Sequence, residues 1–169
     1  MPRLSVTRKA STRRRGRKWS PVLVDSGDIV NVGPQQEKTL VFELCKNSMN
    51  TTTAPTATVI KCGNFKTYVD HFSSASRASN GRVFLMYRPQ GITVTTSYPQ
   101  EHPEYIMAWR TVDTGSDSLQ TTSIQSKLKR NLNSGDAVIL LIIVANNSNI
   151  TGEVAWQFRA TTSYVCCNN

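Results

Sequence analysis

Short segments rich in Val, Ile, Thr and aromatic residues recur about every ten positions through most of this 169-residue chain, and this spacing constrains its fold more than any other feature. Gly, Asn, Ser and Asp, which favour turns, separate the segments. Segments spaced in this way are typical of β-strands joined by turns. The sequence therefore predicts eight strands, at about residues 21–32, 38–46, 57–71, 82–89, 105–113, 121–131, 136–146 and 153–166.

Eight strands in about 150 residues fit a single domain made of two packed antiparallel sheets. We expect an all-β fold over residues 19–169, an eight-stranded single jelly roll with two four-stranded sheets. "SNGR" (79–82) and "NLNSGD" (131–136) predict tight turns, because Asn-Gly and Ser-Gly tolerate positive φ. "PEYIMA", after His102, is the best candidate for a helix of a turn or two, since Pro opens it and Glu follows.

One predicted strand differs from the others in its hydrophobic pattern. "AVILLIIVA", from Ala137 to Ala145, is apolar without alternation, whereas Ile124 and Leu128 alternate with polar residues in the strand before it. The pattern predicts a strand that is buried on both faces or lies at an interface, which is a modest indication of self-assembly. Nine residues are too few to span a bilayer, and no secretory leader follows the start of the chain. We therefore expect no membrane insertion.

Positive charge is concentrated at the start of the chain. The first 18 residues hold eight Lys or Arg and no acid, whereas the other 151 hold twelve Lys or Arg and eleven Asp or Glu. A block of like charge without apolar periodicity predicts a disordered arm over residues 1–18. The alternative is a solvated tail that only keeps the protein soluble. Clustered guanidinium groups instead favour phosphate binding. The predicted nucleic-acid-binding residues are Arg3, Arg8, Lys9, Arg13, Arg14, Arg15, Arg17, Lys18 and Trp19, whose ring either stacks on a base or anchors the arm.

The stretch "RRRGRK" also has the composition of a nuclear-import signal. A host nuclear-import receptor is therefore a second expected partner of this arm. The residues that would carry the signal are Arg13, Arg14, Arg15, Arg17 and Lys18.

Residue types that carry catalysis or bind metals are few and scattered in this sequence. His71 ends a predicted strand and His102 precedes a proline in a loop, so we expect a hydrogen-bonded structural role for the first and a cap on the following short turn for the second. The two histidines and four cysteines form no zinc-ligand spacing. We expect no metal, no cofactor and no enzyme activity.

The four cysteines are expected to be structural or free. Cys45 and Cys62 lie within predicted strands and are expected to behave as small buried hydrophobic residues. The adjacent pair Cys166 and Cys167 lies near the end of the sequence. This pair would either cross-link copies of the chain under oxidising conditions or remain as free thiols in a reducing compartment.

Three segments resemble a known family. "RVFLMYRPQGI" (82–92), "EHPEYIMAWRTV" (101–112) and "SKLKRNLNSGDAVILLI" (126–142) occur in this order, within a stretch of about two-fifths of the chain. They are similar to motifs in capsid proteins of circular single-stranded DNA viruses that encode a replication initiator, the circovirus-like group, with nanovirus-like relatives also open. The arm is shorter here than in typical circoviruses. From their residues, we expect all three segments to serve the fold and to carry no chemical site.

The resemblance implies a single jelly roll and a T=1 icosahedral shell of about sixty copies. It also implies a packaged circular single-stranded DNA genome, arms that face inward, and assembly in the host nucleus before release as a virion.

Three other classes of protein share part of this pattern. A coat protein of a small RNA virus, such as a plant satellite virus, has the same fold and tail, and only the three motifs favour DNA. A cellular nucleic-acid-binding module is disfavoured, because the body outside the arm is nearly neutral. A secreted lectin-like or cytokine-like jelly roll would have a signal peptide and would lack the Arg-rich arm.

Overall fold

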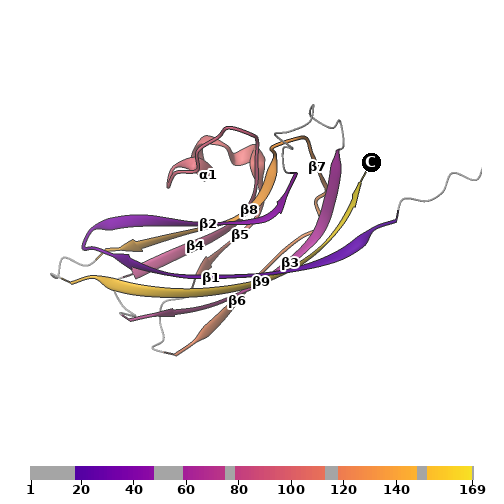
Figure 1. The fold of residues 1–169 in the computed structure, drawn as a ribbon. Helices are drawn as coiled ribbons and strands as arrows, with labels where there is room; N and C mark the ends of the chain where they lie inside the picture. Colours follow the sequence, from indigo (N-terminus) through magenta and orange to yellow (C-terminus); the bar gives the residue numbers. More distant parts are fainter. Residues whose placement is uncertain (1–17, 48–58, 75–78, 113–117, 148–151, 169) are drawn as a thin grey trace, which may run out of the picture.

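A computed structural model of the chain describes residues 18–47, 59–74, 79–112, 118–147 and 152–168. Two antiparallel sheets pack face to face as two layers (Figure 1). The first sheet has the strand order β1 (Ser20–Val32), β9 (Val154–Asn168), β3 (Ile60–Ser73) and β6 (Gln120–Ser126), and the short β7 (Arg130–Leu132) pairs with β3. The second has the order β2 (Gln36–Lys46), β8 (Ala137–Asn146), β4 (Ser79–Arg88) and β5 (Ile106–Val112).

The pairing of the strands defines a jelly roll. β1 pairs with β9, β2 with β8, β3 with β6 and β4 with β5, all antiparallel. The first four strands thus form one side of a long ribbon and later strands the other, and the ribbon is rolled into two sheets. This confirms the predicted fold class.

The region expected as one strand, 121–131, is two strands in the structure. β6 ends at Ser126 and β7 begins at Arg130, so the first sheet has five strands instead of four. Ser126 interrupts the ladder, because its hydroxyl accepts the Leu128 N–H (3.2 Å) and donates to the Met107 carbonyl (3.1 Å). Leu128, expected to be half-buried, is 51% exposed as a result.

The predicted turn at 79–82 is also wrong. Ser79 is paired with Asn146 and is already part of β4, since the chain passes here from one sheet to the other and does not form a hairpin. Gly81 serves close packing, because a Cβ there would stand 3.1 Å from the Val112 side chain. The turn at 131–136 is confirmed: Gly135 has φ +86 and the Asp136 N–H donates to the Asn133 carbonyl at 3.0 Å.

β8 is buried along its whole length and on both faces, which is one of the two outcomes predicted for it. Its inward residues, such as Leu140 and Ile142, belong to the core between the sheets. Its outward residues, such as Ile139 and Leu141, belong to a second cluster with Phe84. The apolar excess of β8 is therefore buried within the chain and gives no indication of self-assembly.

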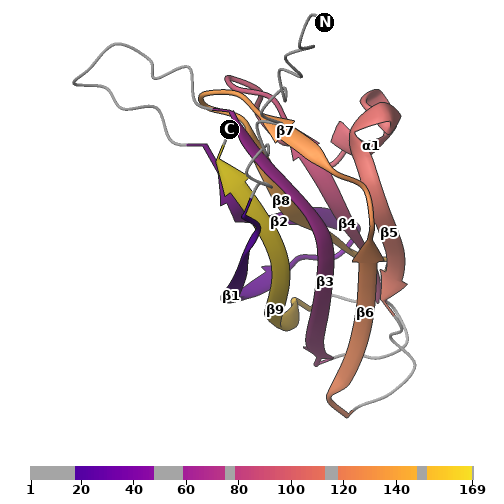
Figure 2. The ribbon, with the colours of Figure 1, turned by 90° about the vertical axis from the view of Figure 1, so that its right-hand side faces the viewer.

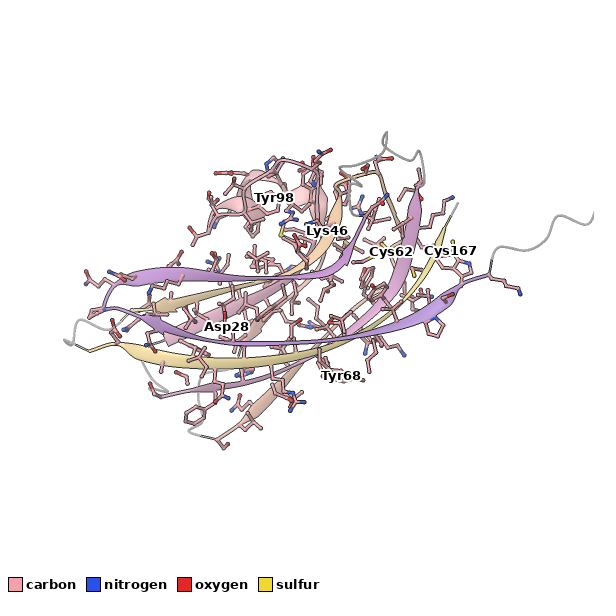
Figure 3. All side chains as sticks on the ribbon, in the orientation of Figure 1. Asp28, Lys46, Cys62, Tyr68, Tyr98 and Cys167 are labelled. Carbon is pink, nitrogen blue, oxygen red and sulfur yellow. The ribbon has the colours of Figure 1, made fainter. Side chains whose placement is uncertain are left out.

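A short helical segment covers this outer face. It consists of α1 (Tyr98–Glu101), which the sequence did not predict, and the single turn η1 (Pro103–Tyr105), which lies within the predicted "PEYIMA". Tyr98 lies between α1 and the sheet (Figure 3), is 1% exposed and donates to the Tyr87 carbonyl at 3.1 Å. The Ser97 side chain makes no cap hydrogen bond to the backbone of α1, and the tyrosine rather than a cap holds it in place.

Two of the three motif segments meet at Asp136. Its carboxylate accepts hydrogen bonds from the Tyr87 hydroxyl (2.6 Å), the Gln90 N–H (3.1 Å) and the Asn133 N–H (2.9 Å). Asp136 is 5% exposed, so these donors replace the water that the buried carboxylate has lost. The "RPQG" and "NSGD" stretches are thus parts of one structural unit.

The third segment packs against the same region. The Tyr105 ring meets the Tyr87 ring edge-on at 5.4 Å and stacks on His102 at 5.1 Å. Trp109, in β5, stacks on Phe84 at 6.2 Å and is 55% exposed. All three motif segments therefore have structural roles, as the sequence predicted, and Trp109 presents an aromatic surface to the outside.

Candidate nucleic-acid interface

The structure describes two of the nine predicted nucleic-acid-binding residues. Lys18 and Trp19 are described, and Trp19 is directly followed by the first strand. The other predicted residues lie outside the described residues: Arg3, Arg8, Lys9, Arg13, Arg14, Arg15 and Arg17. The structure therefore bears on the arm through the place where the chain enters the fold.

Trp19 is held by a side chain from another part of the first sheet. The Lys129 ammonium lies 5.3 Å from the centre of the Trp19 ring, a cation–π contact. The Lys129 stem lies over Gly63, where a Cβ would stand 2.8 Å from the Lys129 Cγ. Trp19 nevertheless keeps 38% of its surface exposed. This contact favours the anchoring role for Trp19 over the stacking role.

The chain enters the first sheet at the end where other strands begin or finish. Ser20 is opposite Cys166 near the end of β9, and Cys166 is opposite Cys62 near the start of β3. On the other side of β3, Phe65 is opposite Ser126, the last residue of β6. Figure 2 shows the start of β3, the end of β9 and β7 at this same end of the sheet. We call it the entry end.

The entry end of the first sheet carries cations and no acid. It comprises residues 18–24, 59–67, 124–132 and 162–168, in which no Asp or Glu occurs. The cations in these ranges are Lys18, Lys61, Lys66, Lys127, Lys129 and Arg130.

Arg130 differs from the five lysines because it points toward the second sheet. Its guanidinium lies 5.7 Å from the Tyr87 ring centre and donates to the Glu104 carbonyl at 3.1 Å. In the part of the chain that the structure describes, none of the five lysines forms a salt bridge. Apart from Lys129, whose ammonium contacts the Trp19 ring, their charge is therefore available to an external anion.

The opposite half of the same sheet is acidic. It holds Asp25, Asp28, Asp70 and Glu153, and Arg159 is its one cation among the described residues. Asp25 accepts a hydrogen bond from Thr161 at 2.7 Å and Asp70 accepts one from Thr121 at 2.5 Å. The nearly neutral body thus has a polarised sheet, which a count of charges along the sequence does not reveal.

The two histidines belong to different elements: His71 lies in β3 and His102 lies between α1 and η1. His71 is 2% exposed, hydrogen-bonds Thr122 Oγ1 through Nε2 at 3.1 Å and lies beside the Trp156 and Phe158 rings, so the predicted structural role is confirmed. His102 lies 3.3 Å from a Glu104 oxygen through Nδ1 and makes no side-chain cap bond. Across the described ranges, no cluster of three His, Cys, Asp or Glu could hold a metal ion.

Three of the cysteines come together near the entry end. Cys62 is 0% exposed and lies opposite Cys166 on the neighbouring strand. A hydrogen bond with Cys45 and burial both raise the pKa of the Cys62 thiol. All four cysteines are free thiols. Cys45 and Cys62 are buried, as predicted. Cys166 and Cys167 lie within β9; Cys167 is 5% exposed and Cys166 is partly exposed, so burial disfavours a cross-link between copies through Cys167 but not one through Cys166.

Comparisons with known proteins give weak similarities. No protein-family model matches the chain, and no curated protein matches it. Among solved structures, the chain is similar to infectious bursal disease virus, Gx strain (TM-score 0.47, 8% identity); the match covers 88% of this chain and spans 32% of that one. It is also similar to the empty head of turnip yellow mosaic virus (TM-score 0.41, 9% identity, 98% of this chain and 89% of that one).

A third similar structure is a family 11 carbohydrate-binding module from Clostridium thermocellum (TM-score 0.36, 14% identity, 85% of this chain and 87% of that one). The TM-scores of all three structures are below 0.5, and these similarities alone establish no function. None of the described helices is long and apolar enough to cross a membrane.

Proposed function

We propose that this chain is a viral coat protein that assembles into a small T=1 icosahedral shell of about sixty copies. In this proposal, residues 1–18 are a disordered arm that packages a circular single-stranded DNA genome, and residues 19–169 form the shell domain. The protein has no catalytic role. It resides in the virion, and Arg13, Arg14, Arg15, Arg17 and Lys18 also direct the protein into the host nucleus through an import receptor.

The observation that carries the proposal is the match between the arm and the place where it joins the fold. Eight cations precede residue 19, and the described half of the sheet that follows carries lysines without salt bridges and no acid. Phosphates are bound through such charges by release of counterions, without readout of sequence. A rigid jelly roll joined to a cationic arm suits a protein that must bind any stretch of a genome.

The resemblance of residues 82–142 to circovirus-like capsid proteins supports DNA over RNA. These segments share one structural role, since Tyr87 and Gln90 both donate hydrogen bonds to Asp136. Residues that hold a fold together report ancestry rather than chemistry. A coat protein of a small RNA virus therefore stands as the alternative that the experiment must distinguish.

Sedimentation velocity of the full-length protein tests the proposal. Circular single-stranded DNA should convert the protein into one fast species that absorbs strongly at 260 nm. Equal masses of single-stranded RNA and double-stranded DNA serve as competitors. If the protein prefers RNA, the coat-protein role stands but the packaged genome is RNA and not DNA. A protein that remains a monomer at high concentration with every nucleic acid would refute the coat-protein role.

A further inference from the structure

A groove opens on the outer face of the first sheet, at its entry end. It lies between the start of β1, the end of β9, the start of β3 and the end of β6, and its volume is about 450 Å³. This volume falls within the range of about 300–1,000 Å³ that is usual for small-molecule sites. The lining includes Lys66, Lys127, Asn64, Gln125, Ser163 and Pro21.

The shape of the groove follows from an irregularity in β3. The pairing of β3 with β9 shifts register between Gly63 and Lys66, and Asn64 has φ +55. A bulge of this kind bends the strand and separates it from its neighbours. The groove forms beside this bulge, and Lys66 is the first outward residue after it.

The chemistry of the lining suits a phosphodiester backbone. Lys66 and Lys127 are exposed and contribute ammonium groups, while Asn64 and Gln125 contribute amide donors. No carboxylate is among the described residues that line this groove. A second groove on the same sheet, of about 570 Å³, is lined by Asp25, Asp28 and one cation, Arg159, so its lining carries a net negative charge whereas that of the first groove is positive.

The groove also offers an apolar surface for sugars and bases. Pro21 and Val165 line it next to the polar groups and face each other across the β1–β9 pair. Single-stranded nucleic acid exposes phosphates and unpaired bases together, and its binding sites combine cationic groups with surfaces on which bases rest. Duplex DNA has its bases stacked inside and would use only the lysines.

The groove is directly continuous with the arm. Pro21 is four residues after Arg17, so at most about 14 Å of chain separates them. Eight arm charges on about sixty copies neutralise about 480 phosphates, fewer than a genome of kilobase length carries. Additional cations on the folded domain would therefore be needed beside the arm.

We propose that this groove is a second binding site for single-stranded nucleic acid, which receives the strand as it leaves the arm. The proposal rests on the function proposed above. It assigns to Lys66 and Lys127 the phosphate contacts, and it makes the outer face of the first sheet the side of the subunit that faces the genome.

The experiment measures the affinity of the full-length protein for a labelled oligo(dT) of about 20 nucleotides, long enough to span an arm and a groove, at several salt concentrations. Lys66→Gln/Lys127→Gln removes both groove charges. Lys38→Gln/Arg110→Gln removes two exposed charges from β2 and β5 of the other sheet, neither of which forms a salt bridge among the described residues, and is the matched control. Each lost phosphate contact reduces the log–log salt slope by about 0.7, so the groove variant should lose about 1.4 and the control should lose none. Oligo(rU) distinguishes RNA from DNA in the same series.

A third variant, Arg13→Gln/Arg14→Gln/Arg15→Gln, separates the two proposals. If this arm variant reduces the slope and the groove variant matches its control, the groove proposal is wrong and the arm remains. If neither variant changes the slope, the proposed function itself fails. Lysine acetylation of the parent protein does not depend on the folding of any variant. Bound oligo(dT) should reduce the acetylation of Lys66 and Lys127 but not that of Lys38. An equal change in acetylation at all three lysines would overturn the groove proposal.

Discussion

The Tyr87 hydroxyl donates to the Asp136 carboxylate at 2.6 Å and so links two segments that lie 49 residues apart in the sequence. Burial of the phenol and its hydrogen bond to Asp136 both raise the pKa of Tyr87. Asp136→Asn replaces an acceptor of three hydrogen bonds with an amide, and we expect it to lower the free energy of unfolding by about 1–3 kcal/mol. Urea denaturation of unassembled protein measures this loss.

Tyr87→Phe and the double variant complete the cycle for this pair. The two residues should show a coupling free energy of about 1 kcal/mol. Additive losses would mean that the hydrogen bond contributes nothing and that Asp136 acts only through the Gln90 and Asn133 N–H groups.

Gly135 should tolerate no side chain. It has φ +86, and a Cβ there would stand 2.6 Å from the Gln90 side chain. Gly91 is a matched control, since its φ is +78 but nothing lies within 4 Å of its Cβ position. Gly91→Ala should cost about 1 kcal/mol for the backbone alone. Gly135→Ala should cost more, and Gly135→Val should damage folding further. Equal melting temperatures for the two alanine variants would show that the contact with Gln90 is unimportant.

Trp19 should stabilise the fold more than it contributes to binding. Trp19→Ala removes the cation–π contact with Lys129, which is worth about 0.5–1 kcal/mol at an exposed site. We expect a lower melting temperature and a nearly unchanged affinity for oligo(dT). A large loss of affinity without any change in melting temperature would mean that Trp19 stacks on a base.

The three consecutive arginines of the arm, 13–15, should act mainly through their charge. Arg13→Lys/Arg14→Lys/Arg15→Lys keeps the charge and should keep the salt slope, to which the eight arm contacts contribute about −6 on a single strand. It should weaken affinity at every salt concentration, because lysine cannot form the bidentate contact that arginine makes with phosphate. Unchanged affinity would show that the bidentate geometry is not used.

The protein should lose stability in alkaline solution. Burial raises the pKa of Tyr98 to about 12, whereas the pKa of a tyrosine in the unfolded chain is about 10. Above this lower pKa the unfolded chain therefore releases a proton that the folded chain keeps, and stability falls until the pH passes the folded pKa. One such tyrosine contributes a slope of up to about 1.4 kcal/mol per pH unit. Tyr98→Phe should reduce the slope between the two pKa values, and an unchanged slope would exclude Tyr98.

The sandwich could be predicted because strand periodicity is local. The alternation of Phe65, Thr67 and Val69 with exposed residues is visible in the sequence, and so is the continuous apolar run of β8. α1 was missed because four residues carry almost no periodic pattern and because the helix depends on burial of Tyr98 against the second sheet. The break between β6 and β7 was missed because it depends on the contact of Ser126 with Met107 in β5.

The cationic entry end could not be predicted from charge counts. Lys61 and Lys66 are far in the sequence from Lys127 and Lys129, and they become neighbours only through the pairing of β3 with β6 and β7. At the other end of the sheet, Asp25 and Asp70 are brought to the same half because β1 and β3 both pair with β9. The clusters "KCGNFK" and "KLKR" were visible, but only the register shows that they lie on one surface.

Cryo-electron microscopy of the species that full-length protein forms with circular single-stranded DNA tests the central claim most directly. The proposal predicts closed icosahedral shells of about sixty copies. The outer face of the β1–β9–β3–β6 sheet, with Lys66 and Lys127, should line the interior, and nucleic-acid density should lie next to it. Open aggregates, a monomer bound to DNA, or shells in which this face points outward and away from the nucleic acid would contradict the account.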